Sequence, residues 1–281
     1  MTELDTIDLH THSSISDGTL APAELIAYAK EKNLCAVALT DHDTIEGIPE
    51  AMESALKHNI ELVAGIELSA YYQHTELHIL GLDIDYQDPK LLFELQQIQN
   101  SRVIRNQAMI DKMSESGIDI TMSKLIDLEG EDILTRMHFA NYLIHVGFAS
   151  SVREAFDKHI GKGGLFYVAR KRISPDFAIN LILDAGGIPI LAHPLLYHFN
   201  DERLDANVKH LTACGLEGIE VYYSMNRGFD EIRMKRLANK YGLKYSGGSD
   251  FHGANKPHID LRSGRNNLNI PYRVLEALRQ R

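Results

Sequence analysis

The sequence contains no tryptophan, only two cysteines and no long apolar run, and each absence narrows what the protein can be. Cys35 and Cys214 stand in apolar surroundings without the spacing of zinc-binding cysteines, so we expect buried free thiols rather than a disulfide. A structural zinc site built on cysteine is therefore not expected. Neither a leading apolar segment nor a membrane-length run occurs, which predicts a soluble, cytoplasmic protein.

Basic residues are also in short supply. The chain has 29 lysines and arginines against 39 acidic residues, for a net charge of −10. Attraction to long nucleic acid or to an anionic membrane is not favoured, although a local basic pocket for a small anionic substrate stays open. What the chain does have is 281 residues with 44% hydrophobic side chains, enough for one packed α/β barrel or two small domains.

The apolar pattern divides the chain into three stretches. Strand and helix patterns alternate up to about residue 85, which predicts a mostly parallel sheet with helices outside. Helical periodicity replaces this alternation from about 91 to 173, and the alternation resumes at Ser174-Pro175. We therefore predict an α/β barrel domain over 1–90 and 174–281, with an inserted helical subdomain over 91–173.

The first predicted strand ends in a His-x-His pair. In Asp8-Leu9-His10-Thr11-His12 the strand period of two turns Asp8, His10 and His12 to one side. Two imidazoles on one face can chelate a cation, and Asp8 could orient one of the rings through its second nitrogen. The plain alternative is a polar strand end with solvated histidines.

Other strand ends carry further candidate ligands. Their number favours a metal site over a polar strand end with solvated histidines. They occur in Ser16-Asp17-Gly18, Thr40-Asp41-His42-Asp43, Gly65-Ile66-Glu67, at His78, in Ala192-His193-Pro194 and in Ser249-Asp250-Phe251-His252. Strand ends are where the chemistry of barrel enzymes converges, so a multinuclear metal site is favoured over unrelated polar strand ends. Mixed imidazole and carboxylate ligands suit zinc, manganese or iron.

Candidate substrate-binding residues lie in the helical stretch. Arg136 precedes His138 by two positions, and a guanidinium offers a planar fork for phosphate. The alternative is an exposed pair that opens a helix. Lys162, Arg170 and Lys171 are weaker candidates, because a charge run is more often solvated.

These motifs, in this order, resemble the PHP family, named for polymerase and histidinol phosphatase domains. The resemblance implies a distorted seven-stranded TIM-like (βα) barrel that holds three divalent cations, which would be manganese, iron or zinc. By position, His10, His12, Glu67 and Asp250 would hold the first cation. The second would be held by Glu67, His78 and His193, with Glu67 bridging, and the third by Asp17, His42 and His252.

A second resemblance concerns the insertion. Arg136-Met137-His138-Phe139-Ala140, Gly161-Lys162-Gly163-Gly164 and Asp184-Ala185-Gly186-Gly187 look like stand-alone PHP phosphoesterases with a helical insertion. That subgroup includes nucleoside 3′,5′-bisphosphate phosphatases and exonucleases that release 5′-nucleotides from short RNA. This chain departs from it at Met137, where such relatives often have proline, and at Ala169-Arg170-Lys171.

The resulting hypothesis is metal-dependent hydrolysis of a phosphomonoester in a small nucleotide-like substrate. Two cations would share a hydroxide nucleophile, His193 and Asp250 would act in catalysis, and the inserted subdomain with Arg136, His138, Lys162 and Lys171 would cap the substrate. A 5′→3′ exoribonuclease acting on short RNA is the main alternative, with Tyr222, Tyr223 and Phe251 as stacking platforms. A histidinol-phosphate phosphatase is a further one.

Two readings from other classes are disfavoured. A C–N hydrolase of the amidohydrolase type would need a strand-end lysine at the metals, which we do not find in the sequence. A non-catalytic binding module would not need the complete ligand set.

Overall fold

The computed structural model describes residues 5–129, 134, 136–169 and 172–280, and the chain forms two compact units. The first unit comprises Met1–Leu95 and Arg172–Arg281, and the second comprises Gln96–Lys171. The first junction lies inside helix α3 (Pro89–Glu115), so one continuous helix belongs to both units. The expected division at residue 90 falls near the start of that helix.

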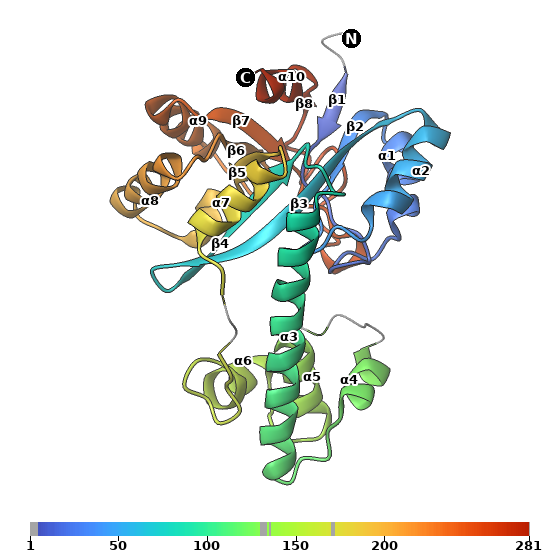
Figure 1. Cartoon of the computed structure of the whole chain (residues 1–281), viewed down its shortest axis with the longest axis vertical. Helices are drawn as coiled ribbons and strands as arrows, with labels where there is room; N and C mark the ends of the chain where they lie inside the picture. The colour runs from blue at the N-terminus through green and yellow to red at the C-terminus, as the bar shows by residue number, and fades with distance from the viewer. Residues whose placement is uncertain (1–4, 130–133, 135, 170–171, 281) are drawn as a thin grey trace. The chain divides into compact units, whose positions relative to one another are not determined.

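The first unit alternates strands and helices, coloured from blue through cyan and from yellow to red in Figure 1. Its first half contains β1 (Thr6–Asp8), α1 (Pro22–Glu31), β2 (Leu34–Leu39), α2 (Ile48–His58), β3 (Glu61–Tyr72) and β4 (Thr75–Leu82). Its second half contains α7 (Pro175–Asp184), β5 (Ile188–Leu191), α8 (Asp201–Ala213), β6 (Gly218–Tyr223), α9 (Asp230–Tyr241), β7 (Lys244–Gly248), β8 (Ile270–Pro271) and α10 (Arg273–Arg279). Ser174 caps α7, accepting a hydrogen bond from Phe177 N, and Pro175 is its first residue.

The strands form one sheet in the order β7-β6-β5-β4-β3-β2-β1-β8. Beyond β1 the backbone N–H of Leu9 donates to Gly247 O at 3.2 Å, and Thr11 pairs in parallel with Phe251, so the sheet nearly closes on itself. This confirms the predicted distorted TIM-like barrel, with short β8 as a strand beyond the seven expected.

Strand β4 is the main departure from parallel pairing. It runs antiparallel to both β3 and β5, while β1, β2, β3 and β5, β6, β7 pair in parallel within their runs. Gln73 and His74 have φ values of 43° and 69°, the positive values that a tight two-residue hairpin turn needs. The short turn leaves no room for a crossover helix, so β4 must reverse direction.

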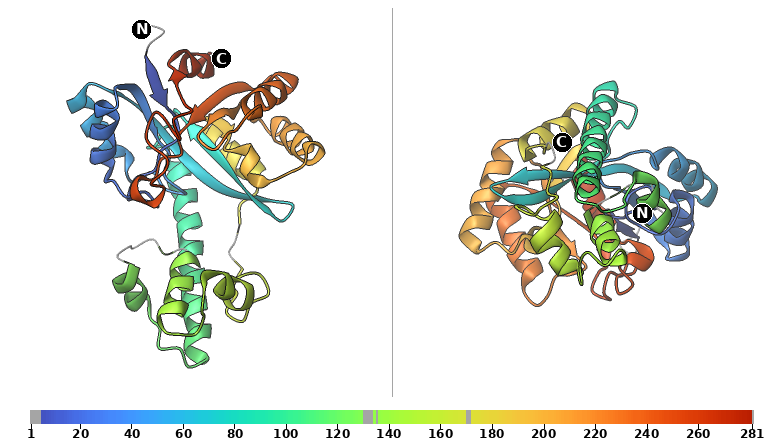
Figure 2. Two further views of the ribbon diagram at one scale, coloured as in Figure 1. Left: turned by 180° about the vertical axis from the view of Figure 1, so that it is seen from behind. Right: turned by 90° about the horizontal axis from the view of Figure 1, so that it is seen from below.

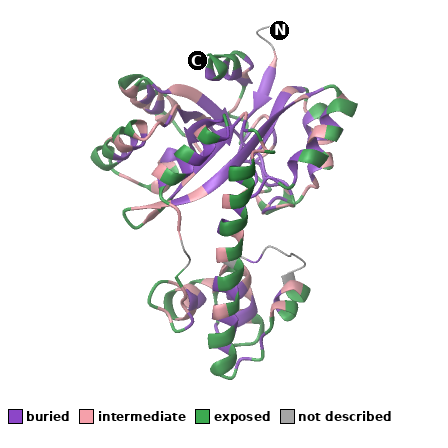
Figure 3. Ribbon diagram, viewed as in Figure 1, coloured by how far each residue is buried: buried purple, intermediate pink, exposed green. Residues whose placement is uncertain are grey.

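The barrel core sits between the strands and the final helix. Ile7, Leu80 and Ile190 belong to an apolar cluster with Leu275 and Leu278 of α10, which lies beside the beginning of β1 (Figure 1). Buried residues follow the strands, and exposed residues follow the outer faces of α1, α2, α8 and α9 (Figure 3). Figures 1 and 2 show α1 and α2 on one side of the sheet and α8 and α9 on the other. Because α10 lies beside the beginning of β1, the opposite ends of the parallel strands are the ones that can carry the functional site.

The second unit contains the rest of α3, α4 (Met122–Glu129), α5 (Arg136–His145), α6 (Val152–Glu154) and a π-helical turn over Ala155–Ile160. Met109 and Met113 of α3 pack with Phe139 and Leu143 of α5 and with Phe166 in a separate apolar cluster. The unit thus has its own core, and its described part contains helices and no strand, as the sequence predicted for this stretch.

Two expectations about the whole chain have outcomes here. Both cysteines are free, but they are half-buried rather than buried: Cys35 Sγ lies 3.2 Å from Thr6 O, and Cys214 Sγ lies 3.0 Å from Asp176 Oδ1. Within the described ranges, every helix is too short or too polar to cross a membrane.

Candidate metal centre

The nine predicted ligands come together at one end of the barrel unit. They come from six strands and the loops that follow them: His10 and His12 after β1, Asp17 in the next loop, His42 after β2, Glu67 in β3, His78 in β4, His193 after β5, and Asp250 and His252 after β7. Groups of these side chains place their nitrogen and oxygen atoms within 4.8 Å of one another. The cluster is therefore a candidate metal centre.

The first group is built on the His-x-His pair. His10 Nε2 lies 3.1 Å from His12 Nε2 and 3.2 Å from Glu67 Oε2, and His12 Nε2 lies 3.1 Å from the same oxygen. Asp250 Oδ1 is 3.6 Å from His10 Nε2 and 3.5 Å from His12 Nε2. A tetrahedral ion with ligand bonds of about 2.0–2.2 Å has ligand atoms roughly 3.3–3.6 Å apart, so these four residues have the spacing of a metal site.

The second group surrounds the other oxygen of Glu67. His78 Nδ1 and His193 Nε2 each lie 2.9 Å from Glu67 Oε1, while His42 Nδ1 lies 3.2 Å from Oε2. The two oxygens of one carboxylate thus face different sets of histidines. A carboxylate that bridges two cations needs its two oxygens to face different ligand sets in this way. The Glu67 side chain that does so is buried, with 1% of its surface exposed.

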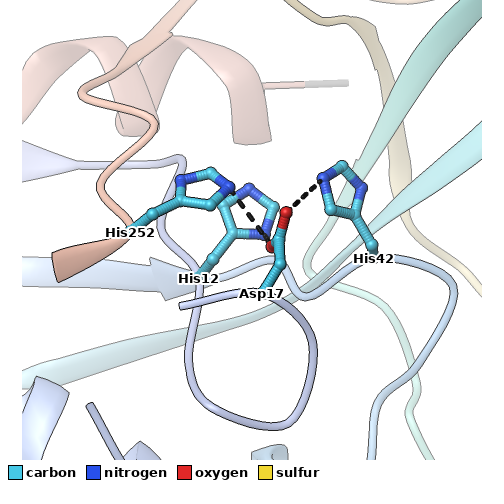
Figure 4. Close-up of side chains that lie close together, drawn as sticks. All are labelled: His12, Asp17, His42 and His252. Atoms are coloured by element: carbon cyan, nitrogen blue, oxygen red, sulfur yellow. Dashed lines mark ion pairs between the residues drawn. The ribbon is translucent and has the colours of Figure 1, made fainter. Parts of the chain in front are cut away.

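The third group is built around Asp17, whose carboxylate Figure 4 shows paired with the rings of His252 and His42. Asp17 Oδ1 is 3.2 Å from His252 Nε2, and Asp17 Oδ2 is 3.7 Å from His42 Nε2. The His12 ring packs at 4.1 Å from the His252 ring and belongs to this group as well, which the sequence did not indicate.

Two ligands reach the site in a way the sequence pattern did not show. We expected Glu67 to end its strand, but β3 continues to Tyr72, and Glu67 is in its middle. His78 likewise lies inside β4, where it pairs with Ser69. Because β4 returns antiparallel beside the overlong β3, its His78 comes to lie beside Glu67.

Glu220 of β6 orients the His10 ring through its second nitrogen, a role that we had predicted for Asp8. The fully buried Glu220 contacts His10 Nδ1 through Oε1 at 3.0 Å and accepts the backbone N–H of His193 through Oε2 at 2.6 Å. Asp8 instead accepts the backbone N–H groups of Ser249 and Arg262. A carboxylate in the otherwise apolar strand Gly218–Tyr223 was the available signal for Glu220.

Asp250 has two partners that sequence reasoning missed. The Tyr223 hydroxyl donates to Asp250 Oδ2 at 2.8 Å, and Lys256 Nζ lies 2.7 Å from the same oxygen. Lys256 reaches the site from a loop and not from a strand end, so it is not the strand-end lysine that an amidohydrolase would need. Tyr223 and Phe251 are 3% and 5% exposed and so are too buried for the base stacking we had predicted, whereas Tyr222, the third proposed platform, is half-buried.

The loop that carries Asp17 is held by Asp41, which is not itself among the grouped ligands. Asp41 accepts hydrogen bonds from the Ser13 backbone N–H at 2.8 Å and from the hydroxyls of Ser13 and Ser16, each at 2.6 Å. Asp41 therefore fixes the turn next to Asp17. This role of Asp41 explains why the motif Thr40-Asp41-His42-Asp43 contains a carboxylate that belongs to none of the three ligand groups.

Both residues we expected to be catalytic have strained backbones. His193 has φ of 27° and Asp250 has φ of 58°, in the left-handed region that residues with a Cβ atom rarely adopt. Such conformations persist where surrounding contacts over-determine them, typically at functional sites. Here the hydrogen bond from His193 N to Glu220 and that from Asp250 N to His10 O provide those contacts.

The charges in the cluster depend strongly on one another. Burial works to lower the pKa of His12 and His78, but Asp250 and Glu67 outweigh it, raising the pKa to about 9 for His12 and about 10 for His78. Burial would raise the pKa of Glu67, yet His42, His10 and His78 hold it well below its usual value. Burial, followed by the nearby His12, lowers the pKa of His42 to about 4. Protons on some histidines thus neutralise the negative charge of the carboxylates. Bound cations would neutralise the same charge in their place.

One further observation indicates that the nitrogen and oxygen atoms of this cluster suit divalent cations. His12 Nδ1 and His42 Nδ1 are buried ring nitrogens without a hydrogen-bond partner among the residues that the structure describes, and they lie 3.6 Å from Asp17 Oδ1 and 3.2 Å from Glu67 Oε2. Buried polar atoms are normally paired. Carboxylates and unpaired imidazole nitrogens crowded at ligand spacing are what divalent cations would bind.

The predicted substrate-binding residues that the structure describes all belong to the second unit. Arg136 and His138 begin α5, and exposed Lys162 follows the π-helical turn, all within the second unit. The Arg136 guanidinium lies 5.4 Å from the Tyr167 ring centroid. Lys171 and Arg170 lie outside the described residues.

Known proteins resemble the chain over almost its whole length. A PHP domain model matches residues 8–159. A 5′-3′ exoribonuclease of Haemophilus influenzae is 35% identical over 87% of this chain and 89% of its own length. A 3′,5′-nucleoside bisphosphate phosphatase of Chromobacterium violaceum is 33% identical over 91% of this chain and 90% of its own length.

Among solved structures, one from Bifidobacterium adolescentis described as a metal-dependent phosphoesterase has a TM-score of 0.77. It is 29% identical, with 98% of this chain and 96% of that one covered. The barrel, its cluster of histidines and carboxylates and these likenesses define a metal-dependent phosphoesterase. The chain belongs to the PHP domain family.

Proposed function

We propose that the protein hydrolyses a phosphomonoester of a small nucleotide-like substrate, such as a nucleoside 3′,5′-bisphosphate, with three divalent cations. The observation that supports this most is the position of Glu67, whose two oxygens each lie within 3.2 Å of different histidines. The likeness to the Chromobacterium violaceum phosphatase supports the substrate class.

The proposed ligand sets follow the groups in the structure. His10, His12, Glu67 and Asp250 would hold the first cation. The second would be held by Glu67, His78 and His193, and the third by Asp17, His42 and His252. When bound, these cations would activate water as a nucleophile near neutral pH and offset charge on the phosphoryl oxygens.

The residues around the ligands support this chemistry. Glu220 holds the His10 ring by its Nδ1 atom, which leaves Nε2 directed at Glu67 and Asp250. His193 is 7–8% exposed at the edge of the cluster and is placed by its backbone hydrogen bond to Glu220. The proton for the leaving oxygen would come from His193 or from a water on the cation that it would hold. Lys256, beside Asp250, adds a positive charge that would favour an anionic substrate.

The inserted unit would supply the remaining substrate contacts. We propose that it acts as a substrate cap in which Arg136, His138, Lys162 and Lys171 bind the second phosphate or the distal end. A planar guanidinium suits a phosphate. Substitution Arg136→Ala should then raise KM for a doubly phosphorylated substrate and leave kcat nearly unchanged. Unaltered kinetics on every substrate would remove Arg136 from the site.

The test of the reaction is phosphate release by metal-stripped enzyme supplied with manganese. Substrates would be 3′,5′-bisphosphoadenosine, a short oligoribonucleotide and histidinol phosphate. Asp250→Asn and His193→Ala should each abolish turnover of the preferred substrate in folded protein, whereas His198→Ala, an exposed histidine outside the cluster, should not. Full activity of Asp250→Asn would contradict the proposal.

A second candidate function is 5′→3′ exoribonuclease activity on short RNA. The likeness to the Haemophilus influenzae exoribonuclease favours it, and the same metal centre would serve. The burial of Tyr223 and Phe251 weighs against base stacking at these two side chains. Faster turnover of the oligoribonucleotide than of the bisphosphate in the same assay would select this function.

A further inference from the structure

A second cluster of metal-binding side chains lies outside the barrel centre. It consists of Asp176 in the first turn of α7, His210 in the last turn of α8 and Cys214, the residue that caps α8. None of the three belongs to the candidate metal centre, and the phosphoesterase reaction uses none of them. The side chains of Asp176 and His210 are 48% and 34% exposed, so an ion in solution can reach them.

The three ligand atoms converge on one point. His210 and Cys214 are four positions apart, which puts them on the same face at the end of α8. Asp176 Oδ1 lies 2.9 Å from His210 Nε2 and 3.0 Å from Cys214 Sγ, and Sγ lies 3.9 Å from Nε2. A tetrahedral zinc-type ion, with bonds of about 2.0–2.3 Å, has its ligand atoms roughly 3.3–3.8 Å apart. Adjustments of under about 1 Å would bring all three into its coordination shell.

The imidazole is already held in place. The Tyr72 ring at the end of β3 stacks on the His210 ring, with centroids 4.8 Å apart and planes 11° from parallel. A ligand that is fixed before binding loses less conformational freedom when the ion arrives. Tyr72 therefore prepares one of the three ligands.

The main rival for such a trio is a cysteine nucleophile activated by histidine. Without a metal, that role needs a lowered thiol pKa, whereas burial and the Asp176 carboxylate raise the pKa of Cys214 to about 11. A bound cation would itself supply the positive charge that removes the thiol proton. The shorter contact of Sγ is also to the carboxylate rather than to the imidazole. The arrangement does not suit nucleophilic catalysis.

We propose that Asp176, His210 and Cys214 form a second metal site, which binds one zinc-like divalent cation. Binding forms a bond from the ion to Sγ and releases the thiol proton to solvent, and water completes the fourth position. The ion would join the first turn of α7, which follows the return from the inserted unit, to the end of α8. Mixed sulfur, nitrogen and oxygen donors favour zinc or cobalt over manganese or magnesium.

Cobalt(II) distinguishes this site from the barrel centre, because the barrel ligands include no cysteine. Metal-stripped protein titrated with cobalt should develop a near-ultraviolet thiolate-to-cobalt absorption band. The band should stop growing when one cobalt ion per chain is bound at this site. The band should persist in Cys35→Ser and disappear in Cys214→Ser, and zinc should displace it. His210→Gln should weaken cobalt binding at this band at least tenfold.

Two results would overturn the proposal. One is no thiolate band when cobalt exceeds all sites in folded wild-type protein, and the other is a band that survives in Cys214→Ser. Phosphate release with manganese serves as the independent readout: Cys214→Ser should retain it, because Cys214 lies outside the reaction site. A loss of activity in a folded Cys214→Ser protein would contradict the separation of the two sites.

Discussion

Replacing Glu220 by glutamine tests whether one buried carboxylate sets the metal affinity of the barrel centre. Glu220 is 0% exposed and contacts both His10 Nδ1 and the His193 backbone N–H. In Glu220→Gln the amide oxygen can keep the hydrogen bond from His193, but the amide NH₂ then faces His10 Nδ1. That nitrogen must become an acceptor, which moves the ring proton to Nε2, the atom that faces Glu67 and Asp250. A protonated Nε2 cannot bind a cation.

The expected loss follows from the single contact that changes. A hydrogen bond to a charged group contributes about 1.5–3 kcal/mol, and losing a carboxylate that orients a metal-bound histidine costs about 10–100-fold in affinity. The two estimates agree, since tenfold corresponds to about 1.4 kcal/mol. We therefore expect Glu220→Gln to bind the tightest cation about 10–100-fold more weakly while remaining folded.

The assay is a titration of metal-stripped protein with zinc or manganese against a competing chelating dye. Glu217→Gln is the matched control, because this half-exposed glutamate precedes the same strand and pairs with Lys244 rather than with the site. Equal affinities of Glu220→Gln and wild-type protein would refute the assignment of Glu220 as the residue that positions His10.

Three further predictions concern the metals, the inserted unit and one buried acid. Removal of divalent ions should abolish phosphate release and manganese should restore it; a fully active metal-free enzyme would exclude the proposed mechanism. Phe139→Ala, at a fully buried position of the second unit, should lower the free energy of unfolding by about 3–5 kcal/mol, against under about 0.5 kcal/mol for exposed Leu165→Ala, as measured by urea denaturation. Burial raises the pKa of Asp8 from 3.8 to about 6, although its hydrogen bonds oppose the shift. The folded protein therefore binds this proton more tightly, and the resulting stability, about 3 kcal/mol, is present below about pH 4 and lost as pH rises through 6. Urea curves of metal-free protein across pH 4–7 should show the stability of Asp8→Asn improving relative to wild type, and a constant difference would show that Asp8 does not titrate there.

The sequence alone was sufficient to find the side chains that gather in the candidate metal centre. Their residue types and their positions at the ends of apolar runs are local properties, so a strand pattern followed by His-x-His or Asp-x-His can be read directly. The change from strand–helix alternation to helical periodicity likewise predicted the helices that the structure shows in the inserted unit. The barrel followed from the same alternation together with the family resemblance.

Only the tertiary structure decided which groups support those ligands. Glu220 is 210 positions from His10, and Lys256 reaches Asp250 from an irregular loop, so no spacing rule connects them. The antiparallel return of β4 and the extension of β3 past Glu67 depend on pairing between strands rather than on either strand alone. The cluster of Asp176 with His210 and Cys214 also arises only where α7 meets the end of α8. In each case the partner was set by packing between segments distant along the chain, which periodicity within one segment cannot encode.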